Sequence, residues 1–432
     1  MMSTGFVRKN ALPQRAPPAD VQGVAGWLRE NMFSTPVSSM LTLLALLIIG
    51  WIVPDLIRFM FIDAVWTASD GAACKAPGAG ACWAYISAKM GFFTYGLYPE
   101  DERWRVNLVL IAGAVLTLWL LWPDARGKPM AAVLFFAAYP VLSFGLLTGH
   151  APFPLGWFAG GAPGSIVIWA FPALLFFAAA GLVAIGQRGW ALFCAGMALW
   201  YLTGLGWREL ELTKVGTHNW GGIFVSLLVA GIGIVFSLPL GVLLALGRRS
   251  ELPIVRFCSV VFIEFIRGVP LITILFMANF MLPLFVPQEW TPDRLLRPLI
   301  GVALFASAYM AEVVRGGLQA IPKGQYEGAM AMGLNWRQMM QLIVLPQALV
   351  LVIPGIVNSF IALFKDTTLV AIAGVFDFLK AIETQREDPA WAGPTISTTG
   401  YLFAAVFYFV FCFGMSRYSI MMEKRLSAGR KH

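Results

Sequence analysis

The sequence predicts an all-α membrane protein with about ten transmembrane helices. Of its 432 residues, 59% are hydrophobic and only 12% are charged, whereas about a quarter of the residues in a soluble domain are charged. The 16 Trp and 33 Phe residues suit a surface that faces lipid. A helix crosses the hydrocarbon layer with about 20 mostly apolar residues. Runs of this kind occupy residues 38–62, 106–122, 130–149, 165–186, 189–206, 222–247, 269–286, 298–314, 342–363 and 399–421. Because 106–122 is short and 189–206 is weak, about eight to eleven spans are compatible with the sequence.

The Lys and Arg residues predict the orientation of these spans, because short cytoplasmic loops carry an excess of them. A cytoplasmic start leaves most basic residues on that side, together with the tail MEKRLSAGRKH. The outer loops also hold basic residues, such as Arg103, Arg105 and Arg208, but acidic residues nearby balance them. We therefore expect both termini in the cytoplasm. The net charge of +8 then reflects orientation in a membrane rather than binding of nucleic acid.

The chain has two halves of different character. Residues 1–210 hold almost no ionisable groups inside their five apolar runs. From about residue 220 onward, charged residues cluster at the ends of the runs in short patterns such as RGVP, AEVVRGG and FKDTTL. No internal repeat links the halves. We expect an N-terminal extension over 1–210 and a second domain over 211–432.

The five cysteines divide into two groups. Cys194, Cys258 and Cys412 lie in or beside apolar runs, where cysteine usually acts as a small hydrophobic residue. Cys74 and Cys82 share a loop rich in Gly and Ala, and they would pair only in an oxidising compartment. The sequence leaves this disulfide open.

The polar stretch EGAMAMGLNWRQMMQLIVLP (327–346) interrupts the apolar runs on the cytoplasmic side. Pro322 suits the first turn of a helix that continues to Met332. Gly333 accepts the left-handed conformation that ends a helix. Asn335 is a good N-cap for the next helix, and Gln338 stands at the spacing of a capping box. The stretch therefore predicts a helix, a glycine joint and a second helix, which form a rigid projection at the membrane surface.

The spacing of six residues in this stretch resembles the Glu-Ala-Ala loop of ABC importer permeases. These residues are Glu327, Ala329, Gly333, Ile343, Leu345 and Pro346. Gly328 stands where that family most often has Ala, a mild departure because both residues are small. The resemblance implies that residues 323–333 form a cytoplasmic coupling helix, which docks into a cleft on a separate ATP-binding subunit.

Three longer segments resemble the polar amino-acid branch of these permeases. They are FIEFIRGVPLITILF (262–276), ALFASAYMAEVVRGGLQAIPKGQYEGAMAMG (303–333) and LPQALVLVIPGIVNSFIALFKDTTLVAIAGV (345–375). The resemblance covers about half the chain and implies a type I core of five helices with its N-terminus outside, which agrees with the topology from charge. The extra leading spans and HNWGG (218–222) look most like the general L-amino acid permeases.

This resemblance implies a function and a set of partners. The chain would be the permease subunit of an amino-acid importer in a bacterial inner membrane, forming half of the translocation pathway. Its partners would be an ATP-binding subunit at the cytoplasmic face, a second homologous permease chain, a periplasmic amino-acid-binding protein and membrane lipid.

The ionisable residues of the core half need partners or a water-lined cavity at membrane depth. Glu264 and Arg267 are three residues apart, as are Glu312 and Arg315, so each couple can pair on one helix face. We expect both couples to be structural ion pairs. Asn358, Lys365 and Asp366 together offer the donors and acceptors that a zwitterionic amino acid requires, so we expect them along the substrate pathway.

The motifs of catalysis and of cofactor binding are missing from the sequence. It holds no G-x-x-x-x-G-K-[ST] phosphate loop, no G-x-S-x-G and no H-E-x-x-H. Its three histidines have no metal-ligand spacing. We expect no enzyme activity, cofactor or metal site, so ATP hydrolysis would belong to a partner. An ion-coupled secondary transporter is the alternative, but it predicts paired repeats and broken helices at matching positions, which the sequence does not show.

Overall fold

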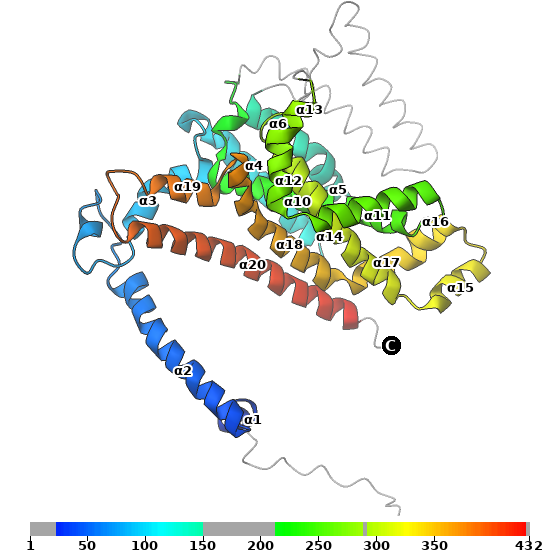
Figure 1. Cartoon of the computed structure of the whole chain (residues 1–432), viewed down its shortest axis with the longest axis horizontal. Coiled ribbons are helices and arrows are strands. Elements are labelled where there is room, and N and C mark those ends of the chain that lie inside the picture. Colours follow the sequence, from blue (N-terminus) through cyan, green and yellow to red (C-terminus); the bar gives the residue numbers. More distant parts are fainter. Residues whose placement is uncertain (1–22, 150–211, 288–291, 429–432) are drawn as a thin grey trace, which may run out of the picture. The chain divides into compact units, whose positions relative to one another are not determined.

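The computed structural model describes residues 23–149, 212–287 and 292–428, and Figure 1 shows the whole chain. Apart from one strand of two residues, the regular structure of these segments is helical, as predicted. In chain order the α-helices are α1 (Gly23–Asn31), α2 (Pro36–Ile57), α3 (Trp83–Tyr95), α4 (Arg103–Leu121), α5 (Lys128–Val133), α6 (Tyr139–Thr148), α10 (Gly222–Arg248), α11 (Pro253–Gly268), α12 (Leu271–Phe276), α13 (Leu282–Phe285), α14 (Leu296–Ala320), α15 (Lys323–Ala331), α16 (Trp336–Met339), α17 (Leu345–Leu351), α18 (Ile353–Asp366), α19 (Phe378–Gln385) and α20 (Ile396–Ala428). Strand β1 is Phe376–Asp377.

Six helices within the described residues are long and apolar enough to cross a membrane. They are Pro36–Ile62, Glu100–Leu121, Gly222–Arg248, Leu296–Ala320, Ile353–Ala373 and Ile396–Leu426. A seventh span is formed if Pro253–Gly268 and Leu271–Phe285, which meet at a bend of 104°, count as one. The predicted runs 165–186 and 189–206 lie outside the described residues. The run 130–149 forms α5, a π-helical turn (Leu134–Ala138) and α6.

One predicted span differs in position. The run 342–363 is divided at Val352, where α17 ends and α18 begins. Pro354 lies in the first turn of α18, where proline is tolerated because the first N–H groups of a helix have no partner within it. The apolar helix then continues through a 3₁₀ segment to Ala373. The earlier part, 342–351, packs its buried side chains Val344 and Ala348 among those of α14.

The chain folds as two compact units, of which the first comprises residues 1–84 and 393–396. Thr35 caps the start of α2, since its hydroxyl accepts the Ser38 N–H at 3.1 Å. Cys74 and Cys82 form a disulfide, which answers the question that the sequence left open. Beside this disulfide the rings of Trp66 and Trp83 stack with their centroids 5.9 Å apart.

The second unit, residues 85–392 and 397–432, is built on α10 and α14, which lie against each other along much of their length. Small residues allow this approach. A Cβ at Gly241 would lie 2.7 Å from Met310 of α14. Towards the start of α10, a Cβ at Gly233 would lie 2.8 Å from Leu363 of α18. The close packing of α10 therefore depends on glycine at both positions.

Two clusters of buried side chains fill the second unit. One surrounds the start of α10, where it includes Phe224, Val229, Leu275, Leu299, Val302 and Leu363. The other surrounds the C-terminal end of α10, where it includes Ala245, Ile263, Met310, Leu318, Met339 and Val344. Both clusters join residues that are far apart in sequence, so the unit is held by packing between helices rather than by local structure.

The start of α10 lies in a tight three-part contact, which we call the glycine junction: Gly96, Gly221, Gly222, Phe376 and Asp377. Bridges pair Gly96 with Trp220, Gly221 with Phe376 and Gly222 with Asp377. Gly96 has φ +64° and Gly222 has φ +69°, a region that L side chains rarely adopt. A Cβ at Gly96 would lie 2.5 Å from Gly221 Cα, so the backbones themselves are in contact.

The glycine junction joins the leading half of the chain to the core half. Residues 85–148 belong to the same compact unit as the helices from α10 onward. Beside the junction, the Lys89 ammonium donates to the Asp388 carboxylate, and the Phe93 and Phe403 rings lie 6.1 Å apart. The expected domain boundary near residue 211 falls at the edge of the undescribed stretch 150–211 and stays a prediction.

Asp377 in this junction has a perturbed acidity. Its side chain is fully buried and caps α19, where it accepts the N–H groups of Lys380 at 3.0 Å and Leu379 at 3.1 Å. Burial raises the pKa of Asp377 to about 7, and these backbone donors only partly oppose the shift.

We predict that Asp377 makes the stability of the detergent-solubilised protein depend on pH. Between about pH 4 and pH 7 the folded protein retains the proton that the unfolded chain releases, so stability falls as pH rises through this window and levels off above it. Asn at this position can still cap α19 but cannot titrate. Melting temperatures of the wild type and Asp377→Asn, measured from pH 4 to pH 8, should differ in slope in this window; parallel curves would contradict the assignment.

Candidate functional site

The helix α15 and the turn after it have the conformation that the sequence predicts. Gly333 lies beyond the end of α15 with φ +75°. Its N–H donates to Met330 O at 2.9 Å, and the Leu334 N–H donates to Ala329 O at 3.2 Å. These two bonds are those of a Schellman motif, which satisfies the last carbonyl groups of a helix. The glycine joint is confirmed.

The start of the next helix, α16, is also confirmed. The Asn335 side chain accepts the Gln338 N–H at 2.9 Å, and the Gln338 side chain accepts the Asn335 N–H at 3.1 Å. This is a complete capping box. The projection therefore has defined geometry at both sides of the joint.

The residues that carry the family resemblance divide between two environments. Glu327, Gly328, Gly333 and Pro346 are exposed, Ile343 and Leu345 are half-buried, and Ala329 is buried. Ala329 belongs to the cluster at the C-terminal end of α10, together with Met339 and Met340. Met332 lies beside the exposed group with 81% of its surface accessible, and Trp336 is 51% accessible. One face of the projection is thus anchored, and the other presents a carboxylate and large apolar side chains.

Three side-chain contacts hold α15 against other helices. Gln347 of α17 donates to the Gln325 side chain at 3.1 Å. The Tyr326 hydroxyl donates to Leu318 O of α14 at 3.1 Å. Arg249, directly after α10, donates to the Tyr326 hydroxyl at 3.1 Å, with its guanidinium 5.9 Å from the ring centroid. In the sequence, the contact between Arg249 and Tyr326 has no signal beyond a pair of arginines at the end of an apolar run.

The four expected ion-pair residues meet in a network at the C-terminal end of α10, where Arg248 joins them. Glu312 contacts Arg315 at 2.6 Å, the expected pair. Glu264 contacts Arg248 at 2.8 Å rather than Arg267, so the expected partner of Glu264 is corrected. Arg267 instead approaches Glu312 at 3.6 Å, and Arg248 also contacts Glu312 at 2.9 Å. Glu312 is therefore shared by three guanidinium groups from three helices, α10, α11 and α14.

The expected pathway residues lie on or at the end of α18. Asn358 and Lys365 are exposed, and Asp366 is half-buried. Asn358 and Lys365 are seven residues apart and share one helix face, on which Pro354 and Ala362 are also exposed. Asp366, four residues after Ala362, lies at the edge of this face. A face of small and polar residues at membrane depth is better suited to a partner helix or water than to lipid.

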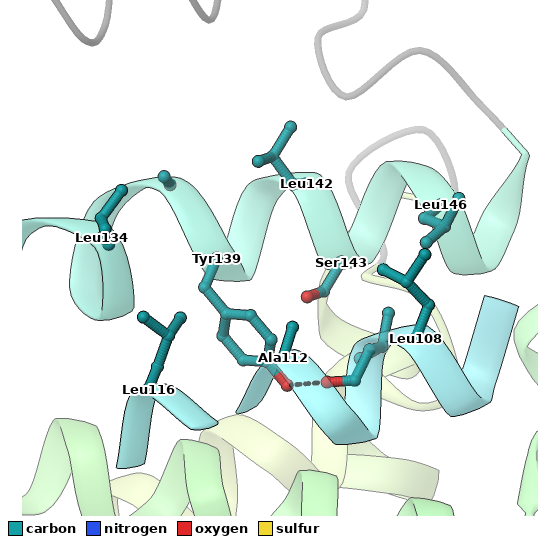
Figure 2. A pocket seen from close by; sticks show the side chains of 10 residues that line it. Leu108, Ala112, Leu116, Leu134, Tyr139, Leu142, Ser143 and Leu146 are labelled. Carbon is teal, nitrogen blue, oxygen red and sulfur yellow. Dashed lines mark hydrogen bonds between the residues drawn. The ribbon is translucent and has the colours of Figure 1, made fainter. Parts of the chain in front are cut away.

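A cavity of about 410 Å³ lies between α4 and the helix formed by α5 and α6. Figure 2 shows Tyr139 pointing across it to α4, where its hydroxyl donates to Val109 O at 3.0 Å. The lining is mostly leucine and alanine and contains no charged residue. It therefore does not suit an amino-acid zwitterion. No group of three or more potential metal ligands occurs within the described residues.

This fold and site define a class of protein, the permease subunits of amino-acid ABC importers. The family model for the binding-protein-dependent transport system inner membrane component matches residues 237–428. The chain belongs to this family, in its polar amino-acid branch. It is a multi-pass protein of the inner membrane, and members of the family have no catalytic activity of their own.

Relatives show which proteins the chain is similar to. It is 44% identical over 406 residues to the inner membrane amino-acid ABC transporter permease protein YhdY of Escherichia coli (strain K12), covering 94% of this chain and 93% of that protein. It is 41% identical over 438 residues to the glutamate/glutamine/aspartate/asparagine transport system permease protein BztC of Rhodobacter capsulatus, covering 99% of each. The probable glutamine ABC transporter permease protein GlnP of Bacillus subtilis (strain 168) is 33% identical over 48% of this chain and 92% of its own length.

These relatives confirm the family expected from the sequence and exclude the alternative of an ion-coupled secondary transporter. YhdY and BztC match over nearly their whole length, so they share the long leading half. GlnP is almost fully covered by half of this chain, so a related permease exists without an extension of this length.

We predict opposite effects of alanine at two glycines of the projection, Gly333 and Gly328. Gly333→Ala forces an L residue into the left-handed region and should lower stability by about 1–2 kcal/mol. Gly328 is exposed within α15 with nothing near its Cα, so Gly328→Ala should raise helix stability by roughly 0.5–1 kcal/mol. Thermal unfolding of the two variants in detergent tests this, and equal shifts would contradict the assigned geometry.

Proposed function

We propose that α15 is the coupling helix through which a separate ATP-binding subunit drives this permease. The observation that carries the proposal is the division of α15 into a packed face, with Ala329 and Tyr326, and an exposed face, with Glu327 and Met332. A carboxylate beside large apolar side chains is suited to a protein partner with a basic residue near an apolar cleft. The defined geometry of the joint at Gly333 supports a role in which movement of the ATP-binding subunit is passed on to the spans.

The proposed topology places both termini and α15 in the cytoplasm. Five spans of a type I core alternate from outside: α10, the bent helix α11–α13, α14, the helix α17–α18 and α20. With five leading spans, the whole chain would have about ten. The disulfide between Cys74 and Cys82 follows the first span, where this topology places an oxidising periplasm, and it supports the assignment.

We infer that the exposed face of α18 lines the translocation pathway. Asn358 and Lys365 on this face offer an amide and a cation to an amino-acid carboxylate, and Asp366 at the end of the helix could accept from the ammonium. A second homologous permease chain would cover the face from the other side, so that each chain forms half of the pathway. A periplasmic binding protein would deliver a polar amino acid of the kind named for BztC.

The leading half is proposed to be a component of the core rather than a loose appendage. Its segment 85–105 supplies one side of the glycine junction and the Lys89 partner of Asp388. Arg105, which is 1% exposed, contacts Glu102 at 2.7 Å and donates to Thr213 O at 2.8 Å. A buried guanidinium whose two terminal nitrogens are paired in this way indicates a permanent contact, since an unpaired one would be very costly.

We predict that Glu327→Lys leaves the protein in the membrane but abolishes ATP-dependent uptake, because a cation replaces the anion on the docking face. Uptake of radiolabelled amino acid into cells or vesicles measures this, with membrane content checked by immunoblot. Glu251→Lys makes the same change at an exposed residue between α10 and α11 and should keep uptake. Wild-type uptake by Glu327→Lys would refute the coupling role.

We predict that the Lys89–Asp388 pair holds the leading half in place. Either Lys89→Asp or Asp388→Lys alone should reduce uptake and lower the melting temperature by roughly 2–4 °C. Because the pair joins two distant segments, the double charge reversal should restore both properties. Lys380→Gln removes a half-exposed ion pair within α19 and serves as the control. A double variant no better than either single variant would contradict this role.

A further inference from the structure

The two arginines at the end of α10 reach in different directions. Arg248 contacts Glu264 and Glu312, so it ties α10 to α11 and α14. Arg249 turns towards α15, where it donates to the Tyr326 hydroxyl at 3.1 Å and approaches Leu318 O at 3.4 Å. Tyr326 is the residue directly before Glu327. A residue after α10 thus contacts the side chain next to the proposed docking carboxylate.

We propose that Arg249 and Tyr326 form a coupling clamp, a second connection by which movement of α15 reaches α10. The proposal rests on the function proposed above for α15. It adds a route from α15 to α10, which the resemblance to the permease family does not imply. Arg249 and Tyr326 are positioning residues in this scheme, since they act through α10 and α15 rather than on the amino acid.

The clamp acts at the joint between α14 and α15, beside the Gln325–Gln347 contact and the packing of Ala329 that also hold α15. Ile321 has ψ 124° and Pro322 has ψ 142°, so the helix is interrupted there and no helical hydrogen bonding carries stiffness across the joint. An α15 attached only through this joint could swing without moving the spans. The Tyr326 hydroxyl prevents this because it bonds to both sides at once: it donates to Leu318 O of α14 and accepts from Arg249.

The partner of the clamp, α10, is suited to carry movement across the membrane. It is a continuous helix of 27 residues, about 40 Å long at 1.5 Å per residue. Its far end begins in the glycine junction, in contact with β1 and with Gly96 of the leading half. Figure 1 shows α15 and α19 at opposite ends of the second unit. The clamp therefore links α15 to the opposite end of the second unit through one helix, α10, which continues past Pro239 in its interior.

The geometry of the clamp distinguishes it from an ordinary surface contact. The Arg249 guanidinium makes two interactions with Tyr326. It donates a hydrogen bond to the hydroxyl, and it makes a cation–π contact 5.9 Å from the ring centroid. Tyr326 is half-buried and packs against the cluster that contains Met310 and Leu318. Tyr326→Phe would therefore keep the ring packed but remove the hydroxyl that joins Arg249 and Leu318, so it tests the hydrogen bonds separately from the packing.

The test compares ATP hydrolysis with transport in the complete importer, with ATP-binding subunit, permease chains and binding protein reconstituted in liposomes. Tyr326→Phe and Arg249→Gln should each raise the ATP consumed per amino acid imported by roughly threefold to tenfold, the factor expected from one lost hydrogen bond in the coupling path. Arg249→Lys keeps the cation and should lie between these variants and the wild type. Arg256→Gln, at an exposed arginine in the first turn of α11, removes the same charge and should leave the ratio unchanged.

A double-mutant cycle decides whether the two residues act together. If they form one clamp, the double variant Arg249→Gln with Tyr326→Phe should be no worse than either single variant. Additive effects, or an unchanged ratio in both single variants, would overturn the clamp. The test separates the clamp from the function proposed for α15. If the ATP consumed per amino acid imported is unchanged in the clamp variants but Glu327→Lys loses uptake, the clamp is refuted and α15 remains the coupling helix. Wild-type uptake by Glu327→Lys would refute both proposals.

Discussion

The close contact of α10 with α14 is the constraint on which the rest of the second unit depends. Gly241 lets α10 approach Met310, and about two turns further along α14, Gly317 lets α17 approach, because a Cβ there would lie 2.6 Å from Ala348 O. Helices in lipid gain little from the hydrophobic effect when they associate, so close van der Waals packing of this kind must hold them together. The two ends of α10 can then carry different specialised contacts without loss of the helix pair itself.

Those two ends have different chemistry, and the difference follows from their surroundings. At the start of α10, Gly221 and Gly222 contact the backbone of Gly96 and of β1, and the buried carboxyl of Asp377 caps α19. At the other end, guanidinium groups surround Glu312, and Arg249 reaches α15. Arginines near a helix C-terminus also interact favourably with its dipole. The first end is a close backbone contact that includes the leading half, and the second is an array of charged and polar contacts between helices.

Local signals in the sequence were sufficient for the projection between α14 and α17. Gly333 and the Asn335–Gln338 pair act through bonds to residues at most five positions away, so their spacing alone predicted their geometry. The partners within the ion pairs could not be predicted from spacing in the same way. Spacing of three residues suggested Glu264 with Arg267, but Arg248 from another helix reaches Glu264 instead. A rule for one helix cannot identify a partner that only packing between helices brings near.

By itself the sequence determined the membrane class, the helical content, the family and the capped turn of the projection, because composition and local hydrogen bonding do not depend on distant residues. Only the tertiary structure decided that the leading half joins the core at Gly96 and Gly222, that Cys74 pairs with Cys82, and that Arg249 meets Tyr326. The two glycines, like Arg249 and Tyr326, come from segments far apart in the sequence that only the packing of the fold brings together, whereas Cys74 and Cys82 share one loop and pair through its folded geometry.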